Sequence, residues 1–193
     1  MRHVVIIQGH PDPAGGHLCN ALADAYAEGA IAAGHGVHRI DIAHIDVPPL
    51  RNKADFESGE VPASLRPARD AIVAAEHVVM VFPLWLGTMP AAVKAFLEQL
   101  MRPGVAFAYQ ENAMPKKLLS GRSAHVIVTM GMPAGLYRWF YRAHGVAGLD
   151  RNILRFVGIS PVRKTYLGLA EGADHSKYDA WLERMRVAGR RLQ

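Results

Sequence analysis

The hydrophobic and polar positions alternate between two kinds of segment along the chain. Nearly continuous apolar runs, typical of strands covered on both faces of a sheet, occur at 3–8, 77–82 and 123–130. Two further strands are expected at 36–42, where apolar and polar residues alternate, and at 160–169.

Between these runs, apolar residues recur every three or four positions, which indicates helices. The expected helices are 18–33, 66–75, 90–101 with Pro90 in its first turn, about 135–158, and 174–191. Residues 43–65 carry three prolines and several charges, and we expect them to be irregular. Helices therefore alternate with strands along the whole chain.

This alternation predicts an α/β fold in a single domain over residues 1–193. Five strands in this rhythm fit the flavodoxin-like doubly wound parallel sheet, with strand order 2-1-3-4-5 and helices on both faces. Ligands of such sheets bind at the carboxyl ends of the strands. We therefore expect the loops 9–17, 83–89 and 130–137 to form one site.

Composition narrows the possible functions. One cysteine, Cys19, excludes an intramolecular disulfide, and the ten histidines are scattered without a metal-binding motif, so no metal is expected. The net charge of +5 is concentrated in residues 122–193, but no nucleic-acid motif accompanies it. The apolar runs are too short for a signal peptide or a membrane span, which favours a cytoplasmic protein.

The first loop, "GHPDPAGGHL", contains neither a dinucleotide-binding nor a Walker A motif. Gly15 and Gly16 stand where a helix begins, and free backbone N–H groups there bind anions. Gly16 is expected to remove a Cβ from the path of a phosphate, and His10 and His17 to add donors. The alternative is a plain connector whose glycines only ease the turn.

The second loop, "FPLWLGTMP", places Trp85 between a strand and a helix start. The ring either caps the core or forms one wall of a pocket for a flat ligand. Its position at the carboxyl end of a strand favours the pocket.

The third loop begins "TMGMPAGLY". Tyr137 and His144 are about two helical turns apart, so one helix face would carry both. Together they could donate to developing negative charge at the rim of a pocket, or the segment could simply pack. Three such loops at one sheet edge favour a flat, phosphate-bearing cofactor, and a flavin mononucleotide fits.

The motifs "GHPDPAGGHL", "FPLWLGTMPAAVKAFLEQ" and "TMGMPAGLYRWFYRAHG" resemble the flavodoxin-like NAD(P)H:quinone oxidoreductases, the DT-diaphorase family, over residues 3 to 170. The resemblance implies non-covalently bound FAD or FMN, a homodimer, and alternating reduction by NAD(P)H and oxidation by a quinone.

The resemblance also implies roles for individual residues. The phosphate and ribityl chain of the flavin would be lined by His10, His17, Leu18 and Cys19. The ring would be backed by Pro83, Leu84, Trp85 and Leu86, and its pyrimidine edge wrapped by Thr129, Gly131 and Gly135. Tyr137 and His144 match the family's catalytic pair, and Phe107 and Tyr109 match aromatics that reach the partner subunit's site.

Two alternatives remain open. The same flavin chemistry could reduce azo dyes, nitro compounds or free flavin. The family also contains regulatory subunits of membrane potassium–proton antiporters, and the basic C-terminal third could face such an acidic partner at a membrane surface. A one-electron flavodoxin is disfavoured, because that class is strongly acidic and this chain has a pI of about 9.6.

Overall fold

The computed structural model describes residues 1–192 and contains a five-stranded parallel sheet with the order β2-β1-β3-β6-β7. The strands are β1 (His3–Gln8), β2 (Gly36–Asp41), β3 (His77–Pro83), β6 (Ser123–Met130) and β7 (Val162–Gly168). This is the predicted order 2-1-3-4-5, so the fold prediction is confirmed. The single domain over residues 1–193 stays a prediction, and Gln193 lies outside the described residues.

Four of the expected helices are present with nearly the expected bounds. They are α1 (Leu18–Ala32), α3 (Arg66–Ala74), α4 (Ala91–Leu100) and α8 (His175–Arg191). The stretch expected to be irregular also contains the short helix α2 (Lys53–Ser58) and two single 3-10 turns, at Ile42–His44 and Ala63–Leu65.

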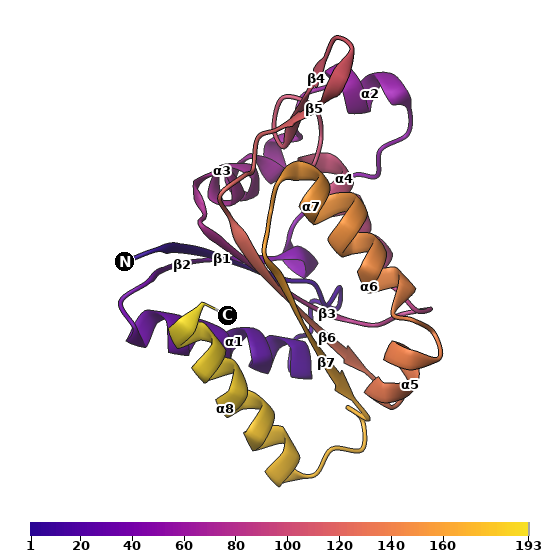
Figure 1. Cartoon of the computed structure of the whole chain (residues 1–193). Helices are drawn as coiled ribbons and strands as arrows, with labels where there is room; N and C mark the ends of the chain where they lie inside the picture. The colour runs from indigo at the N-terminus through magenta and orange to yellow at the C-terminus, as the bar shows by residue number, and fades with distance from the viewer. Residues whose placement is uncertain (193) are drawn as a thin grey trace.

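Each face of the sheet carries its own apolar core, because alternate strand residues point to opposite faces. Val4 and Ile6 point to the layer formed by α1 and α8, where Tyr26 and Met185 are fully buried. Val5 and Ile7 point to the other layer, which contains α3, α4 and the segment 143–159. Figure 1 shows α1 and α8 packed together on one side of the sheet. The apolar runs that predicted the strands are therefore explained by burial on both faces.

A polar network is buried at the amino-terminal edge of the sheet. His77 bonds through Nε2 to the Tyr26 hydroxyl at 3.0 Å and through Nδ1 to the Ser123 hydroxyl at 2.7 Å. His125 Nε2 lies 2.8 Å from the Thr165 hydroxyl. Burial, helped by nearby positive charge, lowers the pKa of His77 to about 4, so this imidazole is neutral in the folded protein.

The segment 107–117 contains Phe107 and Tyr109, the two aromatics that the resemblance places near a partner subunit. It forms an antiparallel hairpin of β4 (Phe107–Gln110) and β5 (Ala113–Lys117), which projects with α2 at the top of Figure 1. Phe107 is buried against Phe156, with ring centroids 5.0 Å apart, whereas Tyr109 is 60% exposed. Only Tyr109 of the two aromatics is therefore free to meet another subunit.

The helix expected at 135–158 is broken. The chain forms α5 (Ala134–Trp139), α6 (His144–Gly148), a π-helical turn (Leu149–Leu154) and α7 (Arg155–Val157). Arg142 and Ala143 adopt left-handed φ angles of 52° and 48°, which no helix accommodates. The prediction that Tyr137 and His144 share one helix face is therefore wrong, and any proximity between them comes from tertiary packing.

Candidate functional site

The three expected loops follow β1, β3 and β6 at the carboxyl-terminal edge of the sheet. The second and third are joined at their bases, because the Leu84 N–H donates to the Thr129 carbonyl at 2.8 Å. The first is joined to the second through side chains: the ring of His10 meets the ring of Trp85 edge-on, with centroids 6.0 Å apart. The edge predicted from strand order is thus built from all three loops.

The second loop closes in a two-residue turn. Trp85 and Thr88 exchange two backbone hydrogen bonds, of 2.9 and 3.0 Å, around Leu86 and Gly87. Both central residues have positive φ, 48° for Leu86 and 79° for Gly87, as a type I′ turn requires. A leucine in this conformation is uncommon and costs free energy. The turn holds Leu86 fully exposed and Trp85 47% exposed beside the sheet edge.

Tyr137 locks this turn to the segment that follows the helix break. Its hydroxyl donates to the Gly87 carbonyl at 3.0 Å and accepts from the Val146 N–H at 3.3 Å. Gly145 allows the approach, since a Cβ there would lie 2.2 Å from the Gly87 carbonyl oxygen. Turn and helix α6 therefore form one interlocked unit.

This unit lines an open cavity of about 580 Å³. The residues that line it are Leu86, Gly87, Thr88, Met132, Tyr137, Tyr141, His144 and Gly145. The structure thus brings Tyr137 and His144 to one cavity in spite of the helix break. A volume of this size suits a small organic ligand.

The two members of that pair differ in exposure. Tyr137 is 1% exposed, and burial raises the pKa of its phenol above the ordinary value. The prediction that Tyr137 sits at the rim of a pocket is therefore wrong for its side chain, which is buried. His144 is exposed and has its imidazole available to a ligand in the cavity.

Exposed aromatic side chains lie close to the cavity in the sequence. Trp139 is 79% exposed and Phe140 is 74% exposed, on the segment where the helix breaks, and the ring of Phe140 contacts Tyr141, which lines the cavity. Trp85 and Leu86 are exposed apolar side chains of the second loop.

The first loop is held together by its side chains. The rings of His10 and His17 stack with centroids 3.6 Å apart, and His17 Nε2 lies 2.8 Å from a carboxylate oxygen of Asp12. The Ala14 N–H and then His17 lower the pKa of Asp12. Burial and the neighbouring His17 lower the pKa of His10, against the opposing pull of the nearby carboxylates. His10 is therefore neutral near pH 7 and can donate or accept.

Gly15 and Gly16 are needed for conformation rather than for space. Their φ angles are +68° and +75°, in the region that favours glycine. A Cβ at Gly16 would meet no protein atom within 4 Å, so the expectation that it would crowd a bound phosphate stays a prediction. Within residues 1–192 the Gly16 N–H has no hydrogen-bond acceptor, and it stands just before α1. This leaves a backbone donor for an anion at the helix start.

Other predicted residues have their side chains inside the protein. Cys19 and Thr129 are 1% and 6% exposed, with Sγ and Oγ1 3.3 Å apart in the core below the loops. Burial raises the pKa of the Cys19 thiol to about 11, which keeps it protonated. Leu18 packs on the same core, and Leu84 on the opposite one. These four position the loops from beneath rather than face a ligand with their side chains.

The remaining predicted positions lie at the margins of the site. Gly131 and Gly135 are exposed on the third loop, and a Cβ at Gly135 would meet no atom within 4 Å. Pro83 ends β3 half-buried. Sequence reasoning missed Met132, Tyr141 and Thr88 as cavity walls, although the pair Leu86-Gly87 already signalled a tight turn.

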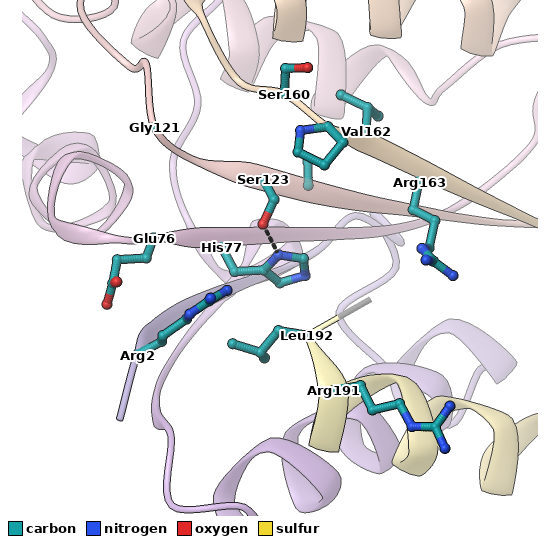
Figure 2. A pocket seen from close by; sticks show the side chains of 12 residues that line it. Arg2, Glu76, His77, Gly121, Ser123, Ser160, Val162, Arg163, Arg191 and Leu192 are labelled. Atoms are coloured by element: carbon teal, nitrogen blue, oxygen red, sulfur yellow. Dashed lines mark hydrogen bonds between the residues drawn. The ribbon is translucent and has the colours of Figure 1, made fainter.

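A larger cavity, of about 840 Å³, lies at the opposite edge of the sheet (Figure 2). Arg2, Glu76, Arg163 and Arg191 surround it, and none of the predicted site residues does. Its imidazole, His77, is already bonded to Tyr26 and Ser123. Size alone therefore does not make it the better candidate, because the imidazole that lines it is already bonded inside the protein.

Two further observations bear on the class of protein. Among residues 1–192, no three His, Cys, Asp or Glu side chains gather in a way that could hold a metal ion. None of the described helices combines the length and apolar character needed to cross a membrane.

Comparison with known proteins gives the relationships of the chain. The family model described as "Flavodoxin-like fold" matches residues 2–188. Among solved structures, the crystal structure of Smu.1420 from Streptococcus mutans UA159 superposes with a TM-score of 0.82 at 24% identity, covering 97% of this chain and 98% of that one.

Two curated relatives carry functional names. An "FMN-dependent NADH:quinone oxidoreductase 2" of Pseudomonas fluorescens is 36% identical over 127 residues, which are 63% of this chain and 61% of the relative. An "FMN-dependent NADH:quinone oxidoreductase" of Azotobacter vinelandii is 30% identical over 141 residues, 69% of this chain and 68% of the relative. The match thus spans less than two thirds of the first relative's length. Neither name supports the antiporter-subunit alternative.

Proposed function

The chain belongs to the family with the flavodoxin-like fold, and from that premise we propose that it is an FMN-dependent oxidoreductase that uses NADH or NADPH to reduce a quinone. The names of the two curated relatives support this activity. The observation that carries the proposal is the interlocked unit at the carboxyl edge of the sheet. It places an exposed Trp85 and a backbone turn beside a cavity lined by Tyr137 and His144.

The donor set of the three loops fits a flavin mononucleotide. The free Gly16 N–H, the start of α1 and the imidazole of His10 offer donors for a phosphate. Trp85 offers a ring face, and the open backbone around Gly131 and Gly135 offers groups for a heterocycle edge. Asp12 is the one carboxylate of the first loop, and His17 balances it at 2.8 Å. We favour FMN over FAD because these groups account for one phosphate.

Bound FMN would supply the hydride acceptor and the two-electron donor of the reaction. The chain's own residues orient and shield the reacting partners. The Tyr137 hydroxyl holds the turn through Gly87, so the walls of the cavity keep their spacing. The exposed His144 imidazole can donate to negative charge that develops in the cavity. Trp139 and Phe140, which are 79% and 74% exposed in the single chain, could exclude water only if a second subunit covered them.

We also propose that the protein is a homodimer, because large apolar side chains near the cavity are exposed in the single chain. These are Trp139, Phe140 and Leu86, and a second subunit would cover them. The projecting hairpin offers Tyr109, which is 60% exposed, and Met114, which is 81% exposed, as further contacts. Light scattering at micromolar concentration tests this, and a monomer with flavin bound and activity intact would contradict it.

The test of the function begins with the purified protein. Denaturation and chromatography should release FMN, and anaerobic NADH or NADPH should bleach the flavin absorption near 450 nm, roughly as for any protein-bound flavin. Addition of a quinone should restore the absorption. If no flavin is released and added FMN and FAD do not bind, the proposal fails.

A further inference from the structure

A strongly basic groove runs along the free edge of the sheet, and it meets the candidate site only at Gly135 of the third loop. β7 is an outer strand, and in Figure 1 it lies between α8 and the segment from α5 to α7. The groove has a volume of about 650 Å³. Its basic lining residues are Arg138, Arg142, Arg151, Arg163, Lys164 and Arg184.

These charges come from separate parts of the chain. Arg163 and Lys164 lie on β7, Arg184 on α8, and the other three on the broken helical segment 134–154. Since neighbouring strand residues point to opposite faces, the groove wraps around the strand edge and draws on both helical layers. The basic residues come together only in the folded chain, so the charge of no single helix or strand predicts the groove.

The positive charge of the groove is not neutralised within the protein. Among residues 1–192, no Asp or Glu lines it. Lys164 is the one lining residue with an ion pair in this part of the chain: its Nζ lies 2.5 Å from Asp150, whose carboxylate also pairs with Arg155 at 2.7 Å. Within residues 1–192, none of the five arginines of the groove forms an ion pair, whereas Arg186 and Arg190 on α8 both pair with Glu183.

Protection of an open strand edge explains only part of this. Charged residues on an outer strand prevent it from pairing with another chain, which accounts for Arg163 and Lys164. It does not account for Arg138, Arg151 and Arg184, which lie on neighbouring elements. Five like charges around one hollow repel each other, and this repulsion is relieved when an anion binds.

We propose that this groove binds a small ligand with two or more phosphate groups. Guanidinium groups match phosphate in a two-pronged geometry, and several arginines suit several phosphates. A volume of about 650 Å³ suits a small molecule. The face of Tyr166 in the groove lies under the Arg138 guanidinium, 5.9 Å from it, so the structure assigns recognition to the phosphates rather than to a stacked base.

The groove also lies behind the candidate active site. Tyr166 lines the groove and Tyr137 lines the cavity, and their rings meet edge-on with centroids 5.8 Å apart. Arg138 directly follows Tyr137 on α5. A ligand in the groove would therefore contact the element that holds the active-site turn. The binding proposal itself does not depend on flavin chemistry.

The first experiment is a calorimetric titration of the purified protein with inorganic tripolyphosphate at 50 and at 300 mM salt. We expect binding at low salt that weakens at high salt, because the screening length shortens. The double variant Arg151→Gln/Arg184→Gln should weaken binding by about tenfold or more. The matched control, Arg2→Gln/Arg191→Gln, removes two exposed, unpaired arginines from the neighbouring cavity of Figure 2 and should change binding less than about twofold.

Competition then separates the sources of the phosphates. ATP and NADPH are each added against bound tripolyphosphate: displacement by ATP indicates a nucleotide effector, and displacement by NADPH alone indicates the reductant. Displacement by neither supports inorganic polyphosphate. The proposal is overturned if tripolyphosphate does not bind at 50 mM salt, if the control pair loses as much affinity as the groove pair, or if only an oligonucleotide binds.

Discussion

The two edges of the sheet use the same residue types for opposite purposes. At the amino edge, His77 is 1% exposed and both of its ring nitrogens are bonded within the protein. At the carboxyl edge, His10 and His17 stack on each other in a half-exposed loop, and His144 is open to a cavity. The polar groups of the first edge are committed to stability, and those of the second remain available to a ligand.

This difference indicates which histidines and tyrosines are available to bind a ligand. The residue type does not decide it, because both edges contain imidazoles and a phenol. The number of protein partners does: His77 has both ring nitrogens bonded in the core, whereas His144 is exposed at a cavity and, within residues 1–192, the Gly16 N–H has no acceptor. Tyr137 lies between the two cases, because it is buried like Tyr26 and lines a cavity like His144.

Removal of an amino-edge histidine should have the largest effect. His77→Ala leaves a cavity and removes the imidazole that bonds to the hydroxyls of Tyr26 and Ser123, and we expect a loss of about 3–4 kcal/mol in the free energy of unfolding. Flavin bound per folded molecule should be unchanged. Urea unfolding measures the loss, with His38→Ala, an exposed histidine on β2, as the control. A loss of stability smaller than that of the control would contradict the claim that the amino-edge histidine stabilises the fold.

The second prediction uses pH on the same residue. The pKa of His77 falls from 6.5 in the unfolded chain to about 4 in the folded one, so only the unfolded state takes up its proton as the pH drops from 6.5 to 4. Stability present above pH 6.5 should therefore decline by about 3 kcal/mol over that window. Urea titrations at several pH values should give a weaker decline in His77→Gln. Equal declines in both proteins would assign the effect to other groups.

The intermediate case is Tyr137. Tyr137→Phe removes the hydroxyl that joins Gly87 to Val146, and we expect a loss of about 1–2 kcal/mol in stability together with slower flavin reduction by NADH. Tyr109→Phe, on the exposed hairpin, is the matched control. Stopped-flow reduction and thermal unfolding are measured on the same samples. Slower reduction without any loss of stability would place Tyr137 with the ligand-facing residues instead.

The smallest effect on stability should come from the carboxyl edge. His10→Ala removes a half-exposed ring that stacks on His17, and the free energy of unfolding should change by less than about 0.5 kcal/mol. The affinity for FMN should nevertheless fall about tenfold, because a phosphate donor is lost. Fluorescence titration of the flavin-free protein measures it. Unchanged affinity with reduced stability would reverse the proposed division between the edges.

The sheet was predictable because its strands are buried on both faces, and such strands leave continuous apolar runs such as 77–82 and 123–130. Strand order followed from the alternation with helices, and it located the three loops. The hairpin at 107–117 was not predictable in this way, because it is mostly exposed and its pattern resembles a loop.

The site was predictable to the level of loops but not of side chains. Arg142 and Ala143 break the helix in the left-handed region without any glycine or proline to signal it. Leu86 also has a positive φ, although here the neighbouring Gly87 indicates a turn. Whether Cys19 and Thr129 face a ligand or the core depends on how α1 sits on the sheet, which no local pattern encodes. The basic groove has the same origin, because its arginines meet only after folding.

The packing of α8 on α1 also sets an order for folding during synthesis. Tyr26 and Cys19 of α1 belong to a core that Met185 and Leu182 of α8 complete. The two helices are far apart in the sequence, and α8 is synthesised after all the other described elements. The Arg186–Glu28 ion pair, 2.8 Å long, joins the same two helices. Until α8 emerges, one apolar layer of the nascent chain stays uncovered, and chaperones would have their binding surface there.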